Sequence, residues 1–247
     1  MENPKAILFD LDDTIIEFEA LASPAWKATL SAMASQLHGR PVEKVRASIG
    51  RVSAQWWSDP ERHCQGRLDL TNTRQRNVAD AFALLGIDDS PLVSRLVEDF
   101  EQRRFEGLCL LPGSIGTIEH FRAAGVRLGL VTNGDSEGQR AKIRRFGLES
   151  YFESIVIEGE FGVGKPDERI FRHALGQLDV SGDEAWMVGD RLEWEIGPAQ
   201  ALGMQGIWVD VAGDGLPPEI DFRPDRIVQR IAELITSTVS GDQDMSS

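Results

Sequence analysis

The chain has 247 residues, 41% of them hydrophobic, and a formal net charge of −14. This composition is typical of a globular protein with a sizeable core, and the negative charge argues against a nucleic acid polymer or an anionic membrane as partner. Two cysteines are too few for a disulfide framework. Because no basic leader precedes an apolar segment and no apolar run approaches the ~20 residues of a membrane helix, we expect a cytoplasmic protein.

The first expected element is a short buried strand at residues 6–10, which runs directly into carboxylates. Residues 6–9 are continuously apolar, and Asp10 and Asp12 follow. Residues two apart in an extended segment point the same way, so these two carboxylates share a side. Like charges this close either share a proton or bind a cation. The stretch therefore indicates either a solvated turn or a metal site.

Residues 18–107 contain helical patterns and no convincing strand. Apolar residues recur at helical spacing in four segments, and Ser90-Pro91 forms a suitable start for the last of them. The expected helices are 24–37, 41–57, 72–85 and 90–106. An all-helical segment that follows a single strand predicts an inserted domain.

Strands and helices alternate through the rest of the chain. The expected strands are 126–132, 154–157, 185–190, 206–210 and 225–228, and the expected helices are 114–125, 136–147, 167–178, 193–203 and 229–239. This alternation predicts an α/β fold, with a Rossmann-like, mainly parallel sheet and helices on both faces. We expect a core of residues 1–17 and 108–240, a helical cap domain of residues 18–107, and a polar disordered tail of residues 241–247.

Polar residues follow several of these strands. Thr132 and Asn133 follow the second expected strand, Lys165 follows the third in a loop, and Asp190 ends a later one. Ligands of open α/β sheets bind beyond the carboxyl ends of the strands, so these groups should meet Asp10 at one rim. Carboxylates suit Mg²⁺, and lysine, hydroxyl and backbone amides, including that of Gly134, suit phosphate. The combination indicates phosphoryl transfer with a carboxylate nucleophile.

Four motifs of this chain resemble, in order, those of the haloacid dehalogenase superfamily: DLDDT at 10–14, VTNGD at 131–135, Lys165 in GKPD, and GDRLEWE at 189–195. The resemblance implies a Mg²⁺-dependent phosphatase that acts on a small phosphorylated metabolite through an aspartyl-phosphate, with the helical insert as a C1 cap. It makes Asp10 the nucleophile and Asp12 the general acid and base. Thr132, Asn133 and Lys165 would bind the phosphoryl group. Asp10, the backbone carbonyl of Asp12, and Asp190 would hold Mg²⁺. A monomer or a homodimer is expected.

One position departs from the family pattern. Where the family often has Asn-Asp, this chain has Trp194-Glu195. The indole of Trp194 only donates hydrogen bonds, whereas an asparagine side chain can also accept them. Glu195 is longer than aspartate by one methylene. Direct ligation of the metal by Glu195 and a role through water therefore both remain open.

Other functions share some of these features. A phosphomutase of the same fold would keep the same residues. A haloacid dehalogenase needs no metal and, within the family, lacks the second aspartate of the first motif, so Asp12 argues against it. A non-catalytic phosphate-binding protein would not need the whole set. Gly159, Gly164 and Lys165 fit the spacing of a nucleotide-binding loop, but the next residue is proline rather than serine or threonine.

Overall fold

The computed structural model describes residues 3–236 and divides into two compact units. Unit 1 is formed by the chain up to Glu17 and from Cys109 onward, and unit 2 extends from Phe18 to Leu108. Among the described residues, no helix combines the length and apolar character that a bilayer crossing requires.

Unit 1 is built on a six-stranded sheet with the order β5-β4-β1-β6-β7-β8. Every neighbouring pair in this sheet is parallel. The predicted α/β fold with a mainly parallel sheet is confirmed. The strands are β1 (Ala6–Phe9), β4 (Arg127–Thr132), β5 (Ser154–Ile157), β6 (Ala185–Gly189), β7 (Gln205–Val209) and β8 (Arg226–Val228).

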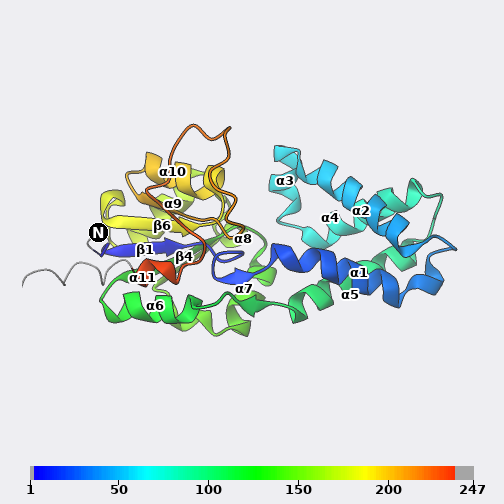
Figure 1. Cartoon of the computed structure of the whole chain (residues 1–247), viewed down its shortest axis with the longest axis horizontal. Coiled ribbons are helices and arrows are strands. Elements are labelled where there is room, and N and C mark those ends of the chain that lie inside the picture. Colours follow the sequence, from blue (N-terminus) through cyan, green and yellow to red (C-terminus); the bar gives the residue numbers. More distant parts are fainter. Residues whose placement is uncertain (1–2, 237–247) are drawn as a thin grey trace, which may run out of the picture. The chain divides into compact units, whose positions relative to one another are not determined.

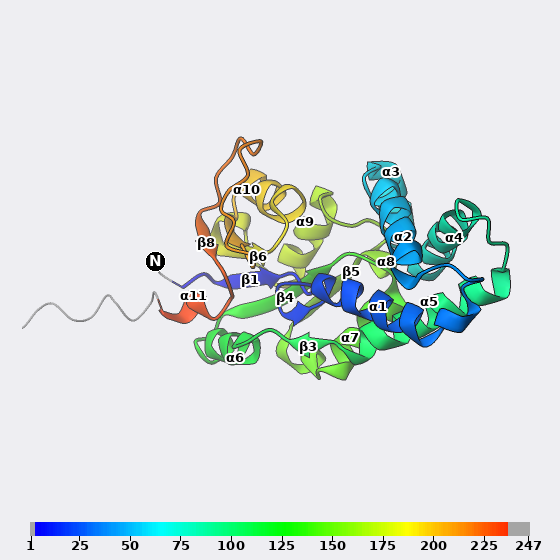
Figure 2. The same cartoon turned by 45° about the vertical axis from the view of Figure 1, so that its right-hand side comes forward.

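Helices cover both faces of this sheet (Figures 1 and 2). Helices α6 (Ser114–Ala123) and α7 (Ser136–Arg145) lie on one face, and α9 (Glu168–Gln177) and α10 (Gly197–Ala201) lie on the other. The shorter elements are α8 (Glu158–Phe161), α11 (Glu233–Thr236), and the 3₁₀ turns η3 (Leu148–Tyr151) and η4 (Gly182–Glu184).

The core of unit 1 explains why β1 is apolar throughout. All four residues of β1 are fully buried, as expected for a strand that is covered on both faces. Leu8 of β1 and Met187 of β6 belong to the same buried cluster as Ile170 and Phe171 of α9. This packing holds the carboxyl end of β1 in a rigid setting.

A small antiparallel ladder joins the two segments of unit 1. Strand β2 (Ile16–Glu17) pairs with β3 (Cys109–Leu110), with Ile16 opposite Leu110 and Glu17 opposite Cys109. The chain therefore leaves unit 1 on one strand of this ladder and returns on the other. The sequence patterns did not predict either strand.

Unit 2 is helical. Helix α1 runs beside α5, and α2 runs beside α4 (Figures 1 and 2). Leu30, Val78 and Leu96, from three of these helices, are fully buried in one cluster. The elements are η1 (Glu19–Leu21), α1 (Ala22–Ala32), η2 (Ala34–Gln36), α2 (Val42–Trp57), α3 (Pro60–Gly66), α4 (Leu70–Ala83) and α5 (Ser90–Glu106).

Three sequence predictions need correction. Helix α3 was not predicted, although Asp59 caps it through the amides of Glu61 and Arg62. The helix predicted at 193–203 is a π-helical turn, η5 (Leu192–Ile196), followed by α10. The helix predicted at 229–239 begins only at Glu233, after 3₁₀-type turns. Its continuation and the predicted tail at 241–247 lie outside the described residues.

Candidate active site

Asp10 stands where the strand order of the sheet reverses. Strand β1 has β4 on one side and β6 on the other, and both pairings are parallel. The Asp10 amide donates to the carbonyl of Val188 at 2.9 Å, which extends the ladder by one residue. The crevice at such a reversal is the usual ligand site of open α/β sheets. The Asp10 side chain is nevertheless buried, with only 5% of the residue exposed.

Lys165 provides the positive charge beside Asp10. Its Nζ lies 2.5 Å from Asp10 Oδ1, 2.6 Å from Glu195 Oε1 and 2.8 Å from the carbonyl oxygen of Val131. These three acceptors match the three donors of an ammonium group. Burial by itself lowers the pKa of Lys165, but the Asp10 and Glu195 carboxylates raise it above its ordinary value. Lys165 therefore remains charged inside the protein.

Three carboxylates gather around this lysine. Asp10, Asp190 and Glu195 each offer an oxygen, and these oxygens lie within 4.8 Å of one another. Burial, followed by the charge of Glu195, raises the pKa of Asp10 to about 7 and that of Asp190 to about 9. Crowded carboxylates of this kind favour a bound cation, and an all-oxygen donor set suits Mg²⁺. The side chain of Asp12 is not part of this cluster.

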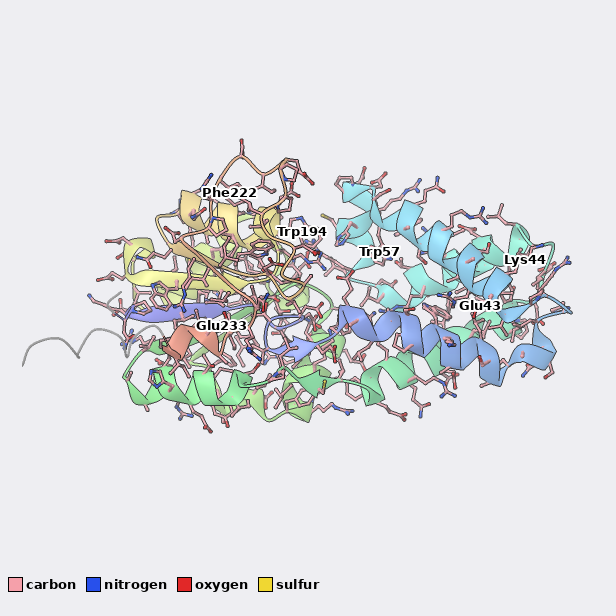
Figure 3. All side chains as sticks on the ribbon, in the orientation of Figure 1. Glu43, Lys44, Trp57, Trp194, Phe222 and Glu233 are labelled. Carbon is pink, nitrogen blue, oxygen red and sulfur yellow. The ribbon has the colours of Figure 1, made fainter. Side chains whose placement is uncertain are left out.

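The π-helical turn brings Glu195 into the cluster. The amide of Ile196 donates to the carbonyl of Arg191 in the wider π pattern. The Arg191 amide also donates to Glu195 Oε2 at 3.0 Å. Trp194 (Figure 3) is only half-buried, whereas Glu195 is 2% exposed. The wide turn therefore turns the carboxylate inward, and π turns of this kind often occur at functional sites.

Gly189 provides the space for this glutamate. A Cβ atom at position 189 would lie 1.9 Å from Glu195 Oε2 and 2.7 Å from its Cδ. No such approach is sterically possible, because non-bonded carbon contacts lie near 3.5 Å or beyond. The Glu195 carboxylate can therefore occupy its position only because residue 189, at the end of β6, is a glycine.

The groups expected to bind phosphate lie at the end of β4. Thr132 Oγ1 accepts a hydrogen bond from the Gln139 side chain. The Asn133 side chain donates to the Lys165 carbonyl at 2.8 Å and accepts from the Lys165 amide at 2.7 Å. The Asn133 side chain therefore fixes the lysine loop. The amide of Gly134, expected as a phosphate donor, instead donates to Glu158 Oε2 at 2.9 Å.

The loop around Lys165 does not have the form of a nucleotide-binding loop. Gly159 lies inside the short helix α8 rather than in an open loop after β5. A Cβ atom on Gly164 would lie 2.4 Å from Glu158 Cδ and 2.6 Å from Asn133 Oδ1. This glycine therefore permits close packing of the loop against the end of β4 rather than leaving a cradle for phosphates.

Asp12 has two partners that the sequence analysis missed. Lys142 Nζ lies 2.9 Å from Asp12 Oδ1 and 2.7 Å from Oδ2. Gln139 Nε2 lies 3.2 Å from Asp12 Oδ2. Both partners belong to α7 and lie three residues apart, on one face of the helix. This spacing alone does not indicate that the face meets Asp12.

Comparisons with known proteins agree on one family. The model of the haloacid dehalogenase-like hydrolases matches residues 4–203. The glyceraldehyde 3-phosphate phosphatase of Methanopyrus kandleri is 32% identical over 236 residues, which cover 94% of this chain and 95% of that protein.

Two solved structures have the same architecture. A HAD-hydrolase from Bacillus subtilis, bound to magnesium, has a TM-score of 0.74 at 22% identity and covers 96% of this chain and 99% of that one. A 2-haloacid dehalogenase from Pseudomonas syringae has a TM-score of 0.63 at 27% identity and covers 95% and 98%, respectively. The first of these likenesses shows the fold alone.

Proposed function

Because the chain belongs to the haloacid dehalogenase-like hydrolase family, we propose that it is a Mg²⁺-dependent phosphatase of a small phosphorylated metabolite, with Asp10 as the nucleophile. The observation that carries this proposal is the buried contact of Lys165 with Asp10 and Glu195, beside Asp190. This arrangement places an ammonium group beside the proposed carboxylate nucleophile, and a divalent cation held by the three carboxylates would add the further positive charge that a phosphoryl group needs inside a protein of net charge −14.

The first half-reaction transfers the phosphoryl group to the enzyme. A carboxylate oxygen of Asp10 attacks phosphorus, and the bond from phosphorus to the substrate oxygen breaks. Asp12 gives its proton to that leaving oxygen, so the product departs as an alcohol. Thr132 and the backbone amide of Asn133 bind the non-bridging oxygens, and Lys165 neutralises their charge.

The second half-reaction releases phosphate. Asp12, now ionised, takes a proton from a water molecule, whose oxygen attacks the aspartyl-phosphate. The bond between phosphorus and the Asp10 oxygen breaks, which restores the Asp10 carboxylate. Inorganic phosphate leaves, and Asp12 is again protonated for the next cycle.

The residues present fit a divalent cation. Asp10, Asp190 and the backbone carbonyl of Asp12 would hold Mg²⁺, with Glu195 in contact either directly or through water. When bound, Mg²⁺ supplies Lewis-acid stabilisation of the phosphoryl oxygens. Glu195 already accepts from Lys165, so it also keeps the lysine beside Asp10. Because one oxygen of Glu195 is occupied by Lys165, we favour contact of Glu195 with the metal through water rather than direct ligation.

The substrate class follows from the relatives. Glyceraldehyde 3-phosphate, named for the protein of Methanopyrus kandleri, is the first metabolite to assay. The proposed cytoplasmic location, the monomeric or homodimeric state, and the role of unit 2 as a substrate-selecting cap remain predictions.

The deciding experiment measures phosphate release from p-nitrophenyl phosphate and glyceraldehyde 3-phosphate, with Mg²⁺ and with EDTA. Asp10→Asn should abolish turnover while the fold stays intact. Asp13→Asn is the matched control, since Asp13 has φ 60° and asparagine tolerates this conformation. Release of phosphate by Asp10→Asn at a rate near wild type would refute the proposed nucleophile.

A second assay separates the nearest alternative class. A 2-haloacid dehalogenase is among the structural neighbours, so halide release from 2-chloropropionate is measured in parallel. Dehalogenation without phosphate release would overturn the phosphatase proposal. The Asp12 side chain, held by two partners from α7, favours the phosphatase, because an acid–base group is needed for an oxygen leaving group.

A further inference from the structure

Helix α7 presents two buried polar side chains to the acid–base group. Gln139 is 4% exposed and Lys142 is 7% exposed, whereas Arg144 and Arg145 of the same helix are exposed. Burial of a lysine ammonium is costly unless it is paired. Here the pairing partner is Asp12, contacted at both of its carboxylate oxygens.

Gln139 joins this pair to the phosphoryl-binding hydroxyl. Its Nε2 donates to Thr132 Oγ1 and lies 3.2 Å from Asp12 Oδ2. The Gln139 amide therefore contacts both the hydroxyl proposed to bind the phosphoryl group and the carboxyl group proposed to protonate the leaving oxygen. A side chain that bridges them fixes their relative orientation.

We propose that Lys142 and Gln139 are positioning residues that fix the direction of the Asp12 carboxyl group relative to the phosphoryl site. This inference rests on the proposed function, because it assumes that Asp12 protonates the leaving oxygen. Donors at both oxygens define the plane of a carboxyl group whose terminal torsion is otherwise soft. Catalysis is sensitive to misplacement on the scale of 1 Å, so loss of these donors should slow the step that needs the acid.

The choice of leaving group isolates that step. An alkyl phosphate needs full protonation of its leaving oxygen, whereas p-nitrophenolate leaves with little help. A purely structural role of α7 would slow both substrates equally. If the α7 side chains instead orient the Asp12 carboxyl group, variants that lack them should slow hydrolysis of the alkyl phosphate more than hydrolysis of the aryl phosphate.

The test compares kcat and KM for glyceraldehyde 3-phosphate and p-nitrophenyl phosphate in Lys142→Met, Lys142→Arg and the control Arg144→Met. We expect Lys142→Met to lower kcat for the alkyl phosphate by about 100-fold and for the aryl phosphate by less than about 10-fold. Lys142→Arg, which keeps the positive charge, should retain most of the wild-type kcat for the alkyl phosphate. Arg144→Met should behave as wild type. Equal slowing of both substrates, or no slowing, would overturn the inference.

Two further measurements keep the outcomes distinct. Circular dichroism and thermal melting establish that each variant folds. If Lys142→Met does not fold, Gln139→Leu, which changes no charge, takes its place in the comparison of the two substrates. Equal slowing of both substrates by Gln139→Leu, or no slowing, would then overturn the inference. Absence of phosphatase activity in the wild-type protein would refute the proposed function. An active wild type whose variants show no difference between leaving groups would refute only the positioning role.

Discussion

Substitution of Gly189 by alanine tests the link between the π-helical turn and the lysine. The added Cβ would lie 1.9 Å from Glu195 Oε2, so the carboxylate must move by about 1.5 Å to reach an ordinary contact distance. That movement separates Glu195 from Lys165, now 2.6 Å apart and both nearly inaccessible. We therefore expect Gly189→Ala to be strongly destabilising.

The expected loss in the free energy of unfolding of Gly189→Ala has two contributions. Overpacking of a core costs about 1–3 kcal/mol, and loss of one partner from a buried ion pair costs about 3–5 kcal/mol. Asp10 continues to pair with Lys165, which reduces the second contribution. We expect a loss of about 3 kcal/mol in the free energy of unfolding. Turnover should fall at least about 100-fold, because Lys165 shifts relative to Asp10.

A second substitution should rescue the first. Glu195→Asp withdraws the carboxylate by one carbon–carbon bond, about 1.5 Å, which equals the required movement. In the double variant Gly189→Ala/Glu195→Asp, the loss of stability should be smaller than the sum of the single losses by about 1–2 kcal/mol. Urea unfolding and hydrolysis of p-nitrophenyl phosphate measure the two effects.

The matched control is Gly176→Ala in α9. A Cβ atom there meets nothing within 4 Å, so alanine should be neutral or stabilising by up to about 1 kcal/mol through its helix propensity. Strict additivity of the two substitutions at positions 189 and 195, or a Gly189→Ala protein within about 0.5 kcal/mol of wild type, would refute the steric argument.

Three further predictions concern acid catalysis, the metal and pH. Asp12→Asn should slow alkyl phosphates more than aryl phosphates, and equal slowing would remove the acid role. Mg²⁺ at 100 times its Kd should stabilise the protein by about 2.7 kcal/mol; thermal melting should show this shift in wild type and its loss in Asp190→Asn. Hydrogen bonding to Arg103 holds the pKa of Asp99 below its usual value, so this stabilisation is present above the unfolded pKa of about 3.9 and disappears as pH falls through the lower folded value. Urea unfolding of Asp99→Asn should accordingly differ from wild type at pH 7 and converge with it in acid, and a difference that persists in acid would contradict this account.

The parts predicted well from sequence are those with a long apolar pattern. Strand β1 is fully buried, and its end carries the carboxylate that the sequence indicated. The pair β2 and β3 was missed because strands of two residues have too few positions for an alternating pattern. The π-helical turn was missed because one wide turn changes the hydrophobic period of a short helix very little.

The surroundings of Asp12 could not be predicted for a different reason. A charged residue on an amphipathic helix has the same local pattern whether it faces solvent or a half-buried carboxylate such as that of Asp12. Lys142 differs from Arg144 only through the packing of α7 in unit 1. Such information is tertiary, so the sequence could indicate Asp12 as the proposed acid but not the residues that hold it.

The register of the β2–β3 ladder has a consequence for how this enzyme can be altered. Glu17 and Cys109, which flank the inserted helical unit, are paired directly opposite each other, and opposed residues of an antiparallel pair lie only about 5 Å apart. A two-residue turn could span that gap. The insertion is therefore a module with adjacent ends, and we expect that it can be exchanged for another, or removed, without a change in the connectivity of the parallel sheet.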